Sequence, residues 1–158
     1  MGSSGIEPSA NEKRTFNRVL CRIKINNSYL GNGFLCKVPY PIKSHLFPVL
    51  ITNKILNKSD ICKKNSFKIY LGKQEKEKEL VYNDKRKIFI SKKYDIVFIE
   101  IFPYKDNINT FLELNEENDE IREDKEINIH QYNDDKEIKI FKGKIKEIKE
   151  FEFKHNCS

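Results

Sequence analysis

Short runs of β-branched and aromatic residues, separated by turn-forming residues, recur along the chain and constrain its fold most strongly. In residues 19–26 apolar and polar side chains alternate, whereas residues 47–52 and 95–101 are almost entirely apolar. Alternation is typical of a strand with one buried face, and a short apolar run is typical of a strand buried on both faces. Because helical periodicity is scarce between these runs, the sequence predicts an all-β fold of antiparallel strands, in a barrel or a sandwich.

The same patterns place the individual strands and turns. The expected strands cover residues 19–26, 34–38, 47–52, 67–71, 87–91, 95–101, 126–132, 136–141 and 144–153. Turns are expected where Gly, Asn or charged residues gather, at residues 31–33, 74–79, 133–135 and 141–144. An acidic, polar segment separates the first six strands from the last three.

Four parts are expected along the chain. Residues 1–16 form a flexible leader, residues 17–103 a six-stranded barrel, residues 104–125 an acidic connector and residues 126–158 an incomplete second barrel. Three strands cannot close a barrel, so we expect the last part to be an open sheet. An open edge is a template for oligomerisation or for pairing with a partner peptide.

The lengths of the apolar runs and the spacing of the cysteines bear on where the protein is located and on whether it binds a metal or cofactor. No apolar run reaches the roughly 20 residues of a membrane helix, and residues 1–20 lack the apolar region of a signal peptide. A cytoplasmic location without membrane contact is therefore expected. Cys21, Cys36, Cys62 and Cys157 lack paired metal-ligand spacing, so we predict free thiols, no metal and no cofactor.

Charge is unevenly distributed along the chain. Residues 1–110 carry 21 Lys and Arg against 10 Asp and Glu, a net +11, whereas residues 111–158 carry 9 against 14, a net −5. A basic body with aromatics interleaved among lysines, as in residues 67–70, is the pattern of a nucleic-acid-binding surface. However, 25 of the 30 basic residues are Lys rather than the base-reading Arg. A solvated surface is the favoured interpretation, and a small basic barrel that binds RNA or another anion is the alternative.

Four segments, taken in order, resemble one protein family. They read GNGFLCKVP at 31–39, FPVLITN at 47–53, YDIVFIEI at 94–101 and FKHNCS at 153–158. In this order they are similar to the trypsin-like serine peptidases. The resemblance implies two six-stranded antiparallel barrels with an active site in the cleft between them.

The chemistry of that family requires a serine nucleophile, a histidine base and a carboxylate that orients the histidine. Asp95 opens an apolar strand and matches the position of the family's aspartate. The histidine would follow Thr52 and Asn53, where this chain has Lys54. A G-x-S-G turn, which would carry the serine and the N–H groups that bind the oxyanion, does not occur before Ser158.

Other residues do not replace the missing base and nucleophile. His45 precedes the strand at residues 47–52, and His130 lies beyond the connector, so neither has the base position. Cys157 has no matched base and no setting that would lower its pKa. Asp95 is therefore the one residue that matches a catalytic position of the family. Without the histidine and the serine, we do not expect it to act in catalysis.

The sequence thus predicts a trypsin-like fold without peptidase activity. The expected role is a catalytically inactive pseudoprotease that acts as a binding scaffold, with a protein or peptide partner at the cleft or the open sheet edge. An alternative is that the chain is the N-terminal fragment of a longer serine peptidase. A G-x-S-G turn downstream of Ser158 would support that alternative.

Overall fold

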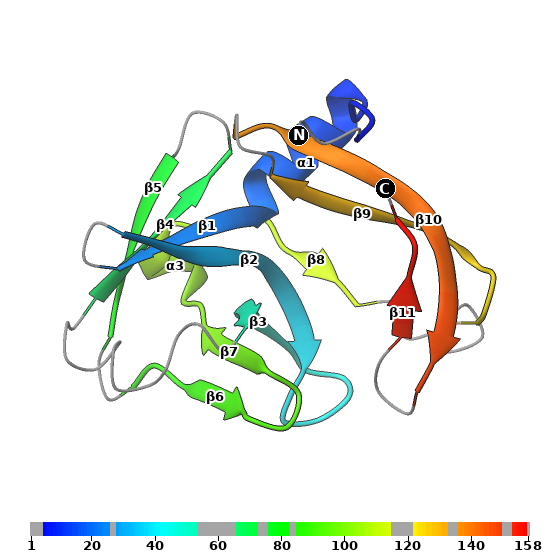
Figure 1. Cartoon of the computed structure of the whole chain (residues 1–158). Coiled ribbons are helices and arrows are strands. Elements are labelled where there is room, and N and C mark those ends of the chain that lie inside the picture. Colours follow the sequence, from blue (N-terminus) through cyan, green and yellow to red (C-terminus); the bar gives the residue numbers. More distant parts are fainter. Residues whose placement is uncertain are drawn as a thin grey trace. The chain divides into compact units, whose positions relative to one another are not determined.

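The computed structural model describes residues 5–25, 28–53, 66–72, 76–82, 85–114, 122–132, 136–149 and 153–157. The protein is mainly β and divides into two compact units (Figure 1). The larger unit comprises Asn17–Leu114, and the smaller unit combines Met1–Phe16 with Asn115–Ser158. No helix in the described ranges is long and apolar enough to cross a membrane.

The larger unit is built on a strongly curled sheet, so the predicted antiparallel β architecture is confirmed in part: the chain is mainly β and also contains helices. Its antiparallel strands follow the order β5-β4-β1-β2-β3-β7-β6, and β8 pairs with β2 in parallel. The strands are β1 (Leu20–Ile25), β2 (Ser28–Pro39), β3 (Leu46–Asn53), β4 (Ser66–Leu71), β5 (Lys76–Val81), β6 (Ile88–Ser91), β7 (Ile96–Glu100) and β8 (Leu112–Glu113). The expected six-stranded barrel is therefore a seven-stranded half-barrel, because the charged segment predicted as a hairpin tip forms β5. Among the described residues no ladder joins the end strands β5 and β6.

β3 is buried on both faces, as its continuous apolar run predicts. On one face Leu50 lies in register with Leu35 and Ile99. On the other face an apolar cluster forms from Cys36, Phe47, Val49 and Ile51, with Phe34, Val38, Phe98 and Leu112 packed against it. Burying each such side chain contributes about 1.5–3 kcal/mol, so β3 anchors the unit from both sides.

The turn expected at residues 31–33 is instead the middle of β2. Gly33 pairs with Cys21 on one side and with Thr52 on the other. A Cβ atom at Gly33 would lie 2.9 Å from the carbonyl oxygen of Ile51. The glycine therefore serves close strand packing rather than a change of chain direction.

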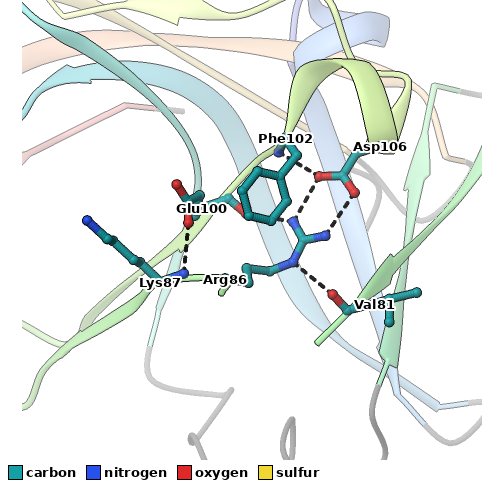
Figure 2. Close-up of polar contacts among 6 residues, drawn as sticks. All are labelled: Val81, Arg86, Lys87, Glu100, Phe102 and Asp106. Atoms are coloured by element: carbon teal, nitrogen blue, oxygen red, sulfur yellow. Dashed lines mark hydrogen bonds and ion pairs between the residues drawn. The ribbon is translucent and has the colours of Figure 1, made fainter. Parts of the chain in front are cut away.

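A buried ion pair links β5 to β7 across the open side of the curled sheet (Figure 2). The two terminal nitrogens of Arg86 each donate to one carboxylate oxygen of Asp106, at 2.8 Å. The same guanidinium donates to the carbonyl oxygen of Val81 in β5 at 2.9 Å and to that of Glu100 in β7 at 2.7 Å. The Arg86 and Asp106 side chains are only 3% and 5% exposed. Side-chain bonds thus join β5 to β7 where the described backbone forms no ladder.

The helix that carries Asp106 completes this ion-pair site. α3 (Pro103–Asp106) follows β7 directly, with a proline in its first turn. The Asp106 carboxylate accepts the backbone N–H of Phe102 at 2.8 Å, and the Phe102 ring lies 4.8 Å from the guanidinium carbon of Arg86. Both charges are therefore neutralised and hydrogen-bonded, as buried charges require.

The smaller unit contains a three-stranded antiparallel sheet in the order β11-β10-β9. Its strands are β9 (Glu126–Tyr132), β10 (Ile138–Ile148) and β11 (Phe153–His155). β10 runs without interruption through residues 141–144, where a tight turn was expected. A Cβ atom at Gly143 would lie 2.5 Å from the backbone nitrogen of Cys157, so this glycine allows residues 156–157 to pack against β10.

The N-terminal residues pack on this smaller sheet. Ile6 exchanges two backbone hydrogen bonds with Ile140 of β10, at 2.8 and 2.9 Å. α1 (Ala10–Val19) follows, a helix that the strand-based interpretation did not include. The hydroxyl of Ser9 accepts the backbone N–H of Glu12 at 3.2 Å, which is the N-terminal capping expected of an S-x-x-E sequence.

Candidate functional site

The end of β3 and the start of β7 lie side by side at one edge of the curled sheet. Asn53, the last residue of β3, pairs with Ile96, the first residue of β7. Asp95 immediately precedes Ile96, so the register places it beside the end of β3. The resemblance predicted the histidine position directly after Asn53. The described residues end there and resume at Ser66, so Lys54 lies outside them.

Asp95 occupies an exposed turn. It is the last of the four residues that join β6 to β7, and its backbone is left-handed, with φ 54°. Aspartate is one of the few residues that adopt this conformation at low cost. The preceding Tyr94 donates its backbone N–H to the hydroxyl of Ser91 at 3.2 Å, which closes the turn. In a catalytic triad the carboxylate is buried against its histidine. Asp95 is instead exposed and has a left-handed backbone, which are features of a turn residue.

Thr52 fixes the end of β3 next to this turn. Its side chain is almost fully buried, with 6% of the residue exposed. The hydroxyl donates to the carbonyl oxygen of Asn32 in β2 at 2.8 Å. This bond satisfies the buried hydroxyl and explains the threonine without assigning it a catalytic role.

His45 lies at the opposite end of β3 from Asp95. It immediately precedes Leu46, the first residue of the strand, whereas Asp95 neighbours the last residue, Asn53. At about 3.3 Å per residue the strand separates these two ends by roughly 25 Å. The ring of His45 contacts the carbonyl oxygen of Tyr40 through Nδ1. His45 is therefore a loop residue, as predicted, and cannot serve as a base for Asp95.

The other two histidines belong to the smaller unit and have partners within it. His130 contacts the Glu12 carboxylate through Nε2 at 3.2 Å, and its ring stacks on Phe16 with centroids 4.0 Å apart. This contact lowers the pKa of Glu12. His155 accepts the backbone N–H of Cys157 through Nδ1 at 3.2 Å. These contacts give both histidines local structural roles.

Three of the four cysteines are described, and all three are free thiols as predicted. Burial raises the pKa of Cys21 to about 12. Burial also raises the pKa of Cys36, and the nearby charge of Glu113 acts in the same direction. Neither thiol is an activated nucleophile. Cys62 lies outside the described residues. The described part of the chain holds no group of three or more His, Cys, Asp and Glu side chains that could bind a metal ion.

The proposed stacking surface at residues 67–70 does not face solvent as a whole. Phe67 is 1% exposed and Ile69 is fully buried, so both belong to the core. Tyr70 follows Ile69 on the less buried side of β4 and donates its hydroxyl to Glu77 at 2.8 Å. One aromatic ring does not make a nucleic-acid platform, and the pattern is explained by the burial of alternate residues of β4.

Comparisons with known proteins identify the fold. No protein-family model matches the chain, and neither does any curated protein. Twenty-three chains of solved structures match it. One is the crystal structure of the Rv3671c protease in its inactive form, with a TM-score of 0.52 and 12% sequence identity. The match covers 92% of this chain and 63% of that chain, so this chain spans less than two thirds of the protease. The fold of this chain is that of the trypsin-like serine proteases.

Proposed function

We propose that this protein is a pseudoprotease, which uses the trypsin-like fold to bind a protein or peptide partner without cleaving it. The observation that supports this most strongly is the register at the end of β3. Asp95 lies beside Asn53, the place where a histidine would meet it, and the sequence continues with Lys54.

A lysine with its ordinary pKa does not perform the task of the histidine. A general base must be unprotonated near neutral pH, whereas an unperturbed lysine has a pKa of about 10.4. His45 is excluded by its position at the far end of β3. Without a base, a serine hydroxyl remains a poor nucleophile wherever it is placed.

What remains is a stable surface. The curled sheet has a core on both faces of β3, and Arg86, paired with Asp106, links β5 to β7. Such a rigid scaffold loses little freedom on association, which favours binding. Function is carried by sites rather than by fold, so the partner is recognised by surfaces that hydrolysis does not need.

Peptide hydrolysis tests the loss of catalysis. The protein is incubated with a panel of chromogenic peptides that cover basic, aromatic and small residues before the scissile bond. We expect no turnover above buffer, and no difference between the protein and Asp95→Asn. Lys93→Gln, in the same exposed turn, is the matched control. Turnover that disappears in Asp95→Asn and persists in Lys93→Gln would show a working triad and overturn the proposal.

A further inference from the structure

We propose that an apolar groove on the outer face of the larger unit binds an acidic peptide segment through an embedded aromatic or aliphatic side chain. This inference rests on the proposed function, because it names the surface and the partner of the scaffold. The groove, hereafter the hairpin groove, encloses about 380 Å³. Its eight lining residues are all apolar or aromatic and include Val38, Tyr40, Phe47, Phe89, Phe98 and Leu114.

Residues of four strands, together with Tyr40 after β2 and Leu114 after β8, build this groove. Val38 pairs with Phe47 across β2 and β3, and Phe89 pairs with Phe98 across β6 and β7. Leu114 follows β8, which lies against β2. The volume falls within the range of roughly 300–1,000 Å³ that is usual for ligand sites. Because rigid strands supply most of the lining, the groove is preformed.

Several of the lining side chains are partly exposed to solvent. Tyr40 is 36% exposed, Phe89 38% and Leu114 50%. The Tyr40 ring packs edge-on against Phe89 at 5.2 Å and tilted against Phe47 at 5.4 Å. Exposed aromatic clusters of this kind are enriched at interfaces and cost little conformational entropy on binding. An inserted aromatic or aliphatic side chain would replace water on these rings.

The hairpin groove is distinct from the end of β3 beside which Asp95 lies. Its lining includes Phe47 and Val49 of β3 and Phe98 of β7, but neither Asn53 nor Asp95. Val49 is four residues from Asn53 and Phe98 is three residues from Asp95, so the nearest lining residues lie roughly 10–13 Å along the strands from the catalytic position of the family. A partner in the groove therefore does not rely on the catalytic position of the family.

Charge indicates an acidic partner. The larger unit, Asn17–Leu114, carries 19 Lys and Arg against 9 Asp and Glu, a net +10. At the groove, the ammonium of Lys87 lies 5.6 Å from the centre of the Tyr40 ring. The neighbouring Glu100 carboxylate accepts the backbone N–H of Lys87 at 2.9 Å. A second copy that docked through the same basic unit would bring like charges together, so the observations favour an acidic peptide segment over a symmetric dimer of this unit.

Fluorescence anisotropy on the full chain tests the partner chemistry. The probe is a fluorescein-labelled octapeptide, Glu-Glu-Asp-Leu-Phe-Asp-Glu-Glu. One control replaces its Leu-Phe centre with Ser-Ser, and the other replaces its acidic residues with Lys. We expect the probe to bind about tenfold more tightly than either control, and its affinity to fall as salt is raised. Equal affinity for all three peptides, or no binding of the probe, would overturn the proposal.

Variants of the groove test the surface. Phe89→Ala and Lys87→Gln should weaken binding of the probe, by about tenfold and about threefold respectively. Val81→Ala and Lys105→Gln are matched controls, because Val81 is exposed outside the groove and Lys105 lies over the Phe102 ring. Urea unfolding of each variant verifies the fold. Equal binding by the groove variants and the wild-type protein would contradict the inference.

Two further readouts separate the inference from the proposed function. Sedimentation velocity over a range of concentrations detects self-association; a dimer that is lost in Phe89→Ala, without binding of the probe, would make a second copy the occupant and overturn the inference. Mass spectrometry of the probe detects cleavage. Cleavage of a probe that still depends on Phe89 would overturn the pseudoprotease assignment and leave the groove intact.

Discussion

At the scale of single residues, Asp95 fits both the aspartate position of a peptidase family and the role of a turn-forming residue. Its sequence position matches the aspartate of the peptidase family, and its backbone, with φ 54° in an exposed turn, is that of a turn-forming aspartate. Sequence reasoning located Asp95 but missed Arg86 and Asp106. The two residues are 20 positions apart in the chain, and Arg86 also reaches the carbonyl oxygen of Glu100 14 positions away, so no local pattern reveals the pair. From the sequence alone, a single arginine is expected at the surface, whereas the structure buries Arg86.

Cysteine reactivity provides a prediction at this scale. Iodoacetamide attacks thiolates, and burial raises the pKa of Cys21 to about 12. Cys157 is only partly buried. We expect native protein at mildly alkaline pH to be alkylated at Cys157 well before Cys21, which should react only after unfolding. Peptide mass spectrometry over time measures both. Modification of Cys21 as fast as Cys157 in folded protein would contradict the described core.

The Arg86–Asp106 pair provides a second prediction. Asp106→Ala leaves a buried guanidinium without its carboxylate, which typically costs about 3–5 kcal/mol of unfolding free energy. The double variant Arg86→Met with Asp106→Leu should lose less, because it removes both charges. Urea unfolding measures each loss. Glu77→Gln, which removes one side of the exposed Lys68–Glu77 pair, is the control and should unfold at nearly the wild-type midpoint. Equal losses for Asp106→Ala and this control would show that the buried Arg86–Asp106 pair does not stabilise the folded protein.

At the scale of elements, strong apolar runs were predictable and glycine contacts were not. β3 and β7 follow directly from their runs of apolar residues. Gly33 and Gly143 resemble turn residues, yet each serves close packing against Ile51 or Cys157, and the sequence does not reveal these neighbours. β5 was missed because Leu80 is its one buried residue, and cross-strand contacts of charged side chains replace the usual apolar alternation.

The N-terminal arm should respond to acid. Hydrogen bonds from Lys13, and then from Lys139, lower the pKa of Glu7 to about 2. A carboxylate with a lowered pKa stabilises the folded state above its ordinary pKa of 4.5, and this contribution is lost as pH falls from 4.5 towards 2. We therefore expect the backbone amide signals of Ile6 and Ile140 to shift over this range in NMR spectra.

Glu7→Gln is the control for this acid response. The amide group retains hydrogen bonding but has no charge to titrate, so the Ile6 signal should lose most of its pH dependence in this range. The Ile6–Ile140 backbone bonds themselves carry no titratable group. An unchanged titration in Glu7→Gln would show that the arm responds to some other carboxylate.

At the scale of the whole molecule, four short motifs in order were sufficient to predict the trypsin-like fold that the solved structures share. Composition and charge alone were not sufficient to predict this fold, because a basic β-protein is equally compatible with an RNA-binding barrel. The hairpin groove could not be predicted, since its lining comes from residues 38–49, 89–98 and 114, which only the folded sheet brings together. Sequence patterns thus located strands well and surfaces poorly.

Limited proteolysis with a Glu-specific protease should reveal the two units. Many glutamates lie in residues 112–126, and others, such as Glu77 and Glu100, lie in strands of the larger unit. We expect the first cuts in residues 112–126 and a persistent fragment that retains the curled sheet, because cleavage requires local unfolding of a strand. Early cuts at Glu77 and Glu100 with residues 112–126 intact would contradict an independently stable larger unit.

We propose that this chain has a protease fold without a working catalytic base, and active-site labelling tests this claim most directly. A fluorophosphonate probe forms a covalent adduct with a serine hydroxyl that a histidine has activated. Intact-mass spectrometry after incubation with the probe, with trypsin as the positive control, should show no adduct on this protein. A stoichiometric adduct that disappears in Asp95→Asn and persists in Lys93→Gln would contradict the claim.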